Sequence, residues 1–146
     1  MQRANPIVVT LVGLVSSLAV GPANAEVVAV VSATSAVTTL SKVQITDIFL
    51  GKTVRFPNGN AAVPVDQAEG TPARDEFYAR FTGKSAGQLK AHWSKIIFTG
   101  RGRPPKTVPN SLALRKLVAE SPSAIGYIDR NAVDGSVRVV RVNLDD

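Results

Sequence analysis

The side chains best suited to binding chemistry lie in one short stretch, Ala62 to Phe81. Thr71 and Pro72 are typical of a helix start, because a threonine oxygen suits the N-cap and proline needs no amide at the first helical position. The amides of a first helical turn lack intrahelical acceptors, and the helix dipole places partial positive charge there. An anion is therefore expected to sit against Gly70, Thr71 and the guanidinium of Arg74. A plain capped helix explains the same residues without a ligand, so both interpretations remain open.

Apolar runs and capping patterns define the elements that must position this stretch. Val27 to Val31 is a continuous apolar run, which suits a strand buried on both faces, as in a parallel sheet. A capping box at Ser41 and Gln44 predicts a helix over residues 42–50. Val63 and Val65 predict the strand before the polar loop, and the helix from Pro72 presents an apolar stripe to the sheet. The members of that stripe are Ala73, Phe77 and Phe81.

The second half of the chain continues the alternation of helices and strands. Ser85 and Gln88 form another capping box, and the helix after it is expected to bury one apolar face. That face consists of Leu89, Trp93, Ile96 and Ile97. Residues 101–109 (RGRPPKTVP) are rich in cations and proline, which predicts an exposed loop rather than an element. A further helix is expected around Leu114, a strand over residues 125–128 and an edge strand over residues 137–142.

This order of elements predicts the α/β class with a mostly parallel central sheet flanked by helices. Binding sites in such sheets lie beyond the carboxyl ends of the strands. The rule favours two loops, residues 32–35 and residues 66–71, because both follow apolar strands. The expected ligand-binding residues of both loops and of the helix that follows are Ser32, Thr34, Ser35, Asp66, Gln67, Gly70, Thr71 and Arg74. Their hydroxyls and amides are expected to face one crevice.

Residues 1–25 have the three parts of a secretory signal peptide. Arg3 supplies the positive charge, Ile7 to Val20 is an apolar run, and Ala23 to Ala25 forms an A-x-A cleavage site. The apolar run is shorter than the roughly 20 residues that a membrane-spanning helix requires, and no later segment is long enough. We therefore expect cleavage near Ala25, a periplasmic or secreted protein without a membrane span, and one domain over residues 26–146.

The composition excludes several function classes. The chain has no cysteine and one histidine, so thiol chemistry, cysteine-zinc sites and histidine metal clusters lack the residues they need. His92 lies on a predicted helix without the partners of a catalytic triad, and we expect neither an enzyme nor a cofactor. The formal net charge of +6 favours anionic partners. The basic loop has no interleaved aromatic residues, so nucleic acid is not an expected partner.

Four segments together resemble the phosphate-binding proteins of phosphate ABC transporters, which have the type 2 periplasmic-binding fold. The segments are AVVSATSAV, LSKVQITDIFLGK, PVDQAEGTPARDEF and SAIGYID, and they occur in the family's order and spacing. The resemblance covers about residues 28–142, which corresponds to one lobe of a two-lobed clamshell. It implies phosphate or a similar anion as the ligand and an ABC permease as a partner.

The sequence departs from the family pattern at the phosphate loop. The family typically has Ser-Gly-Thr-Arg, with an arginine four residues before the serine. Here Thr71 to Arg74 (TPAR) stand in that place and Gln67 occupies the arginine's position. Pro72 has no amide hydrogen and Gln67 no charge, so two anion contacts are weakened. The alternative function is therefore a single-lobe module that contacts a protein or another envelope component and no longer binds phosphate tightly.

Overall fold

The structure is a computed structural model that describes residue 4 and residues 26–144. The predicted cleavage site at Ala23 to Ala25 lies outside the described residues, so the signal peptide stays a prediction. The elements in chain order are β1 (Val27–Ser32), β2 (Thr39–Ser41), α1 (Lys42–Phe49), β3 (Val63–Gln67), α2 (Pro72–Thr82), α3 (Ala86–Phe98), β4 (Lys106–Val108), α4 (Ser111–Ala119), β5 (Ala124–Asp129), the 3₁₀ helix η1 (Arg130–Ala132), β6 (Val137–Val139) and β7 (Arg141–Asn143).

The central sheet has five strands in the order β4-β3-β5-β1-β6. Strand β3 pairs in parallel with both β4 and β5, whereas β1 pairs antiparallel with both β5 and β6. Four strands therefore run in one direction and β1 runs against them. Two further short strands, β2 and β7, pair in parallel as a separate ribbon. The predicted fold class, α/β with a mostly parallel central sheet flanked by helices, is confirmed.

Strand β1 is buried along its whole length, as its apolar run predicts. Its expected parallel pairing is wrong, however, since both of its neighbours are antiparallel. An apolar run records burial on both faces of a sheet and carries no information on strand direction. The antiparallel direction puts the carboxyl end of β1 at the opposite edge of the sheet from the carboxyl end of β3.

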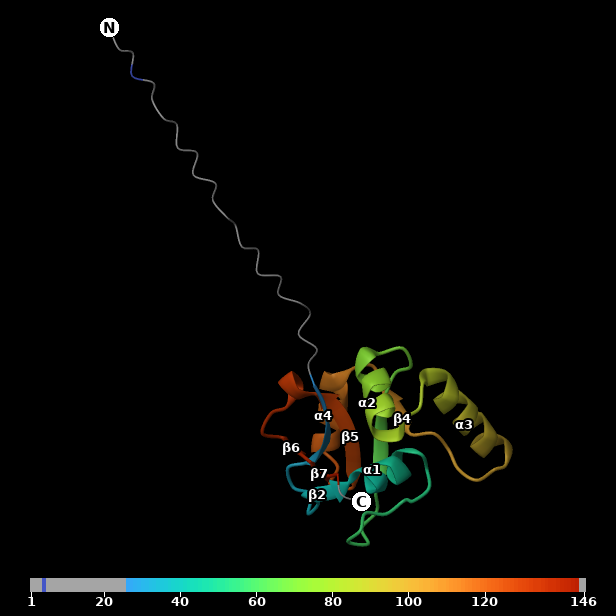
Figure 1. Cartoon of the computed structure of the whole chain (residues 1–146). Helices are drawn as coiled ribbons and strands as arrows, with labels where there is room; N and C mark the ends of the chain where they lie inside the picture. The colour runs from blue at the N-terminus through green and yellow to red at the C-terminus, as the bar shows by residue number, and fades with distance from the viewer. Residues whose placement is uncertain (1–3, 5–25, 145–146) are drawn as a thin grey trace.

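Helices cover both faces of the sheet in a three-layer arrangement (Figure 1). One face packs under α1 and α2, and Trp93 of the neighbouring α3 joins Phe49, Phe77 and Tyr127 of β5 in one buried cluster. The other face packs against α4, and this second cluster includes Leu114 and other residues of α4, β1 and β5. The alternation of side chains along a strand thus sends successive residues of β1 into different cores.

Two helix starts agree closely with the sequence patterns. Capping boxes at Ser41 and Ser85 begin α1 and α3, with side-chain and backbone bonds in both directions. Gly83 ends α2 in the left-handed conformation, with φ of +68°. The described residues contain no helix long and apolar enough to cross a membrane.

Three expectations on the second half of the chain are wrong in part. Residues 106–108, predicted within a basic loop, form β4, because pairing with β3 satisfies their backbone groups despite the nearby prolines. The single edge strand expected over residues 137–142 is divided into β6 and β7, which belong to different sheets. Ile97, expected in the core, is 56% exposed, because the end of α3 extends beyond the surface it packs against.

A substitution at Gly126 in β5 tests how tightly α4 packs on the sheet. A Cβ atom at Gly126 would overlap the buried side chain of Leu114, whereas a Cβ at Gly87 in α3 would meet open space. We expect Gly126→Ala to lower the free energy of unfolding by about 1–3 kcal/mol through overpacking. Gly87→Ala is the matched control and should stabilise the helix by up to about 1 kcal/mol. Urea denaturation measures both, and equal stability of the two variants would contradict the packing described here.

Candidate functional site

A buried carboxylate lies at the carboxyl end of β3. Asp66 is 1% exposed, and its two oxygens accept hydrogen bonds from the hydroxyls of Tyr78 (2.6 Å) and Tyr127. The backbone amide of Gln67 also donates to this carboxylate, at 2.9 Å. The guanidinium of Arg74 lies 3.5 Å from Oδ2 of Asp66. Asp66 thus connects β3 to α2 and β5 through groups that are all donors.

Burial sets the protonation of this cluster. Desolvation raises the pKa of Asp66 above its ordinary value, against the smaller lowering effects of Tyr127, Tyr78, Arg74 and the Gln67 amide. The same burial, together with the Asp66 carboxylate, raises the pKa of both tyrosine hydroxyls, so both hydroxyls remain donors. The three groups therefore form one stable network within the protein core, and Asp66 presents no free oxygen to a ligand.

Arg74 has two tasks at this junction. Its Nη1 donates to the backbone carbonyl of Gln67 at 2.9 Å, and its guanidinium carbon lies 5.6 Å from the centre of the Tyr78 ring. The side chain is 16% exposed. Within the described residues, Nε and Nη2 make no hydrogen bond. Among the described residues the guanidinium is thus hydrogen-bonded to the protein through Nη1 alone.

Gln67 is directed into the protein. Its side-chain amide donates to the hydroxyl of Ser111 at 3.1 Å and to the carbonyl of Tyr127 at 3.0 Å. Ser111 in turn donates to Asp129 and accepts from the Asp129 backbone amide. Both amide hydrogens of Gln67 are thus used in joining β3 to β5 and α4.

The loop before α2 has a different geometry from the predicted cap. Thr71 occupies the N-cap position, but its side chain makes no capping bond, so the prediction of a threonine cap is wrong. Its hydroxyl donates instead to the carbonyl of Ala68, at 3.0 Å, because the turn at Gly70, with φ of +89°, brings that carbonyl within reach. The first-turn amides of α2 therefore lack a side-chain acceptor, and the end of the helix keeps its partial positive charge.

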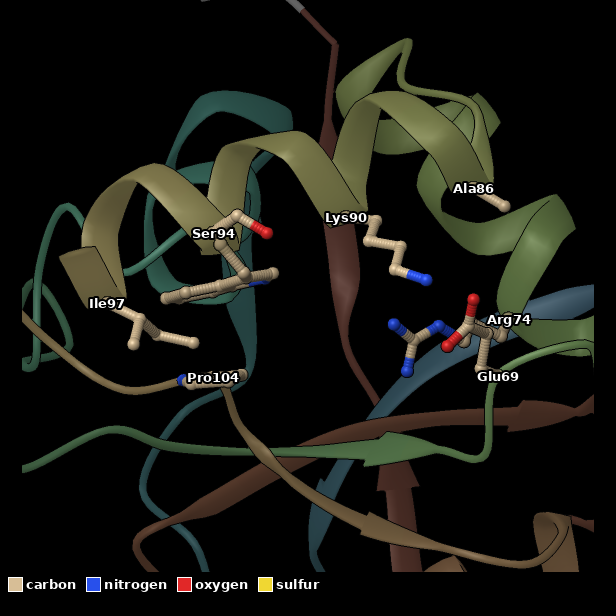
Figure 2. Close-up of a pocket in the computed structure, with 8 residues that line it drawn as sticks. Glu69, Arg74, Ala86, Lys90, Ser94, Ile97 and Pro104 are labelled. Atoms are coloured by element: carbon tan, nitrogen blue, oxygen red, sulfur yellow. The ribbon is translucent and has the colours of Figure 1, made fainter.

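A pocket of about 210 Å³ lies between this first turn and α3. Its lining residues are Glu69, Arg74, Ala86, Lys90, Trp93, Ser94, Ile97 and Pro104. Figure 2 shows the amino group of Lys90 directed toward the guanidinium of Arg74, with the carboxylate of Glu69 beside it. Two cations and a hydroxyl thus face one space. The pocket can hold a small anion, and Glu69 opposes that binding.

Lys90 and Ser94 are not among the residues predicted from the sequence, although their spacing carries a signal. They follow Leu89 and Trp93 by one position each, so they lie four residues apart on the face next to the buried stripe of α3. The sequence prediction assigned the apolar stripe of this helix to the core. It did not include the polar face beside that stripe among the candidates for the site at the junction of β3 and α2. A comparison of this polar face with the start of the helix at Pro72 would have suggested that Lys90 lies near Arg74.

The other predicted loop lies elsewhere. Ser32 is the last residue of β1, and Thr34 and Ser35 follow it. The antiparallel direction of β1 places all three at the opposite end of the sheet from Gly70 and Thr71. The expectation that both loops face one crevice is therefore wrong.

The hydroxyls of this second loop are used locally. Ser32 bonds to Thr34 (2.9 Å) and donates to the carbonyl of Ala119, while the hydroxyl of Ser35 accepts from the amide of Val37. The guanidinium of Arg138 donates to the carbonyls of Ala33, Ser35 and Val37, at 2.7 to 3.3 Å. The loop is thereby held to β6 and α4 by bonds within the protein.

Solved structures of phosphate-binding proteins resemble the chain. A protein assigned as a phosphate ABC transporter substrate-binding protein from Clostridium perfringens, with bound phosphate, matches 80% of this chain at 27% identity and a TM-score of 0.64. An ABC-type phosphate transport receptor from Vibrio cholerae matches 82% at 19% identity and a TM-score of 0.64. PstS from Borrelia burgdorferi matches 80% at 12% identity and a TM-score of 0.54. The chain spans 44% to 47% of the length of these proteins.

The fold and these matches define the class as an α/β domain of the kind that forms one lobe of a periplasmic substrate-binding protein. The chain is a single-lobe structural relative of the phosphate-binding proteins of phosphate ABC transporters, as the resemblance of the four sequence segments implies. These structures are described as binding proteins or transport receptors and none as an enzyme. No protein-family model matches the chain, and no curated protein matches it by sequence.

The raised pKa of Asp66 predicts a pH dependence of stability. The folded state binds the proton of Asp66 more tightly than the unfolded chain does. The contribution of Asp66 to the free energy of unfolding therefore falls as the pH rises from 3.8, the ordinary pKa of an aspartate, through its raised pKa in the folded state. Urea denaturation over this pH range should show wild type losing stability relative to Asp66→Asn, in which the group does not titrate.

Tyr127→Phe removes a hydrogen bond that lowers the pKa of Asp66, so in this variant the fall should extend to higher pH. It should also cost about 1–3 kcal/mol of stability at neutral pH, because a buried acceptor loses a donor. A pH-independent difference between wild type and Asp66→Asn would show that the carboxylate is not buried in solution.

Proposed function

We propose that the protein is an exported solute-binding-like protein that binds phosphate or a similar anion at the junction of β3 and α2. The ligand would sit in the pocket between α2 and α3, against Arg74, Lys90 and Ser94, with Gly70 and Thr71 at the adjoining start of α2. It would serve uptake or sensing of the anion, with an ABC permease or an envelope protein as the partner.

One observation carries this proposal, the convergence of Arg74 and Lys90 at an uncapped helix start. Cations and free amides are the groups that bind phosphate in proteins, and a charge-assisted bond is roughly twice as strong as a neutral one. The similarity to a phosphate-bound protein at 27% identity supports the same ligand class.

The charges of the site also set an upper limit on affinity. Asp66 lies 3.5 Å from Arg74 and compensates part of its charge, and Glu69 lines the pocket itself. A site that is open to solvent on one side buries less of a small ligand than a closed cleft does. We therefore expect a dissociation constant for phosphate on the order of a millimolar at low ionic strength.

Calorimetric titration with phosphate, with sulfate and with chloride at equal ionic strength tests the proposal. Wild type should bind phosphate or sulfate and show no heat with chloride. If wild type binds neither oxyanion at about 10 mM, which corresponds to less than about 3 kcal/mol of affinity, the anion-binding proposal fails.

Substitutions at Lys90, Glu69 and Arg74 locate the site, with phosphate affinity as the measurement. Lys90→Ala should weaken binding about 5-fold through loss of one exposed charge, while Lys95→Ala, on the same helix but outside this pocket, should leave it unchanged. Glu69→Gln removes a repulsive charge and should strengthen binding about 5-fold.

Arg74→Ala should weaken binding roughly 10- to 150-fold, and it should also destabilise the fold because Asp66 loses its cation. Arg74→Lys keeps the charge at Asp66 and separates the two effects. Unchanged affinity in Lys90→Ala, Glu69→Gln and Arg74→Lys would place any bound anion elsewhere on the protein.

A second candidate function is favoured by the use of Arg74 inside the protein. Its bonds to Gln67 and Asp66 explain its presence without a ligand. In that case the lobe is an interaction module that contacts a protein or another envelope component, and calorimetry should detect no anion at all.

Export gives a separate prediction on the N-terminus. Arg3, the apolar run and the A-x-A motif predict cleavage after Ala25, which would leave Glu26 as the first residue. Mass spectrometry of the protein isolated from its native host should find the mass of residues 26–146. An intact terminus at Met1 or Gln2 would contradict export by this signal.

A further inference from the structure

The end of α3 and the loop that follows form a projecting tip, residues 95–106 (KIIFTGRGRPPK). Figure 1 shows α3 at the periphery of the molecule, with this loop forming its outermost part before the chain returns to β4. The amides of Gly100 and Arg101 donate to the carbonyls of Ile97 and Ile96, both at 3.1 Å. The chain therefore reverses at the end of the helix and keeps the loop beside the last helical turn.

The tip exposes large apolar side chains. Phe98 is 92% exposed, more than any other large apolar residue of the described chain, and its neighbour Ile97 is 56% exposed. Ile97 lines a shallow hollow together with Gly100, Gly102, Arg103 and Pro104. Transfer of an aromatic side chain from water into an apolar medium lowers its free energy. Phe98 has no such environment within the fold, because Trp93 and Ile96 are the last residues of α3 that pack against the core on this side of the sheet.

The charged residues of the tip itself are all cations. The tip contains Lys95, Arg101, Arg103 and Lys106, and it contains no aspartate or glutamate. Within the described residues, none of these four cations lies within 4.0 Å of a carboxylate. They are exposed, so their charge is available to a partner.

We propose that the tip of α3 is a membrane contact, in which Phe98 and Ile97 insert into the interfacial region of a bilayer and the four cations bind anionic phospholipid headgroups. Interfacial binding requires both buried apolar area and attraction to anionic lipid, and the tip combines the two at one end of the molecule. The contact would hold the lobe on a membrane surface without a membrane-spanning helix.

Two features favour a lipid surface over a protein partner. The most exposed apolar side chain projects from a helix end, whereas protein interfaces place their aromatic anchors in packed patches surrounded by a polar rim. The charges are all of one sign over the whole tip, which matches a surface with uniform negative charge. A protein partner would need an acidic patch of the same extent with an apolar socket at its centre.

Vesicle flotation tests the proposal with the full chain, using vesicles of phosphatidylcholine alone and of phosphatidylcholine mixed with phosphatidylglycerol. Wild type should bind the anionic vesicles more tightly, and the binding should decline with added salt. Phe98→Ala should reduce binding to anionic vesicles about 10-fold, and Arg101→Gln and Arg103→Gln about 5-fold each. All variants carry the same N-terminal segment, so a difference in binding between them reports the substituted residue.

Matched controls separate the tip from general surface effects. Val54→Ala removes an apolar side chain that is 71% exposed at another loop, and Lys116→Ala removes a cation from α4, on the opposite face of the sheet. Both should bind vesicles as wild type does. Lys90→Ala should also bind normally, so a failure of the tip and a failure of the anion pocket are distinguishable.

Phe98→Trp gives a direct signal of insertion. The only native tryptophan, Trp93, is 6% exposed, so its fluorescence should change little when the tip contacts lipid. A change in the emission of Phe98→Trp therefore reports the environment of the tip. Anionic vesicles should shift the emission of Phe98→Trp to the blue, and brominated lipid should quench it. Equal vesicle binding by wild type and Phe98→Ala, equal binding to neutral and anionic vesicles, or an emission spectrum that vesicles do not change would overturn the proposal in favour of a protein contact.

Discussion

The burial of one carboxylate constrains most of this structure. Asp66 lies at the point where β3 ends, and three elements must supply donors to it: Tyr78 and Arg74 from α2, Tyr127 from β5 and the amide of the next residue. A buried charge without such partners costs several kcal/mol, so the position of α2 relative to the sheet is set by the requirement that these donors meet. The stacked rings of Phe77 and Tyr127, 4.1 Å apart, support the same arrangement from the apolar side.

This constraint also limits what the candidate site can do. Arg74 is the strongest anion-binding group at the start of α2, and part of its charge is directed to Asp66 and to the carbonyl of Gln67. At the proposed site, stability and ligand affinity would therefore depend on the same side chain. Lys90 has no such structural task among the described residues, so it is the group through which affinity can change without affecting the fold.

Local patterns predicted local structure well, and arrangement in space poorly. The capping boxes at Ser41 and Ser85 fixed two helix starts, because those bonds join residues three positions apart. The burial of Asp66 was not predictable from its neighbours in sequence, since Tyr127 lies 61 positions away. The two site loops were wrongly placed together for the same reason. Strand direction depends on which distant strands pair. An apolar run such as that of β1 is the same pattern whether the strand pairs in parallel or antiparallel with its neighbours.

The position of β1 in the sheet has a consequence for how the protein folds. This strand comes first in the described chain, but it lies between β5 and β6, which come near the end, and the ion pair of Glu26 with Arg130 spans 104 positions. The central ladders of the sheet therefore cannot form until nearly all of the chain has been synthesised. Contacts of such long range slow folding, because the entropy of closing a large loop is lost before any pairing is gained. A nascent chain with this topology stays unfolded for longer than one built from neighbouring hairpins, and an unfolded chain can pass through a narrow translocation channel.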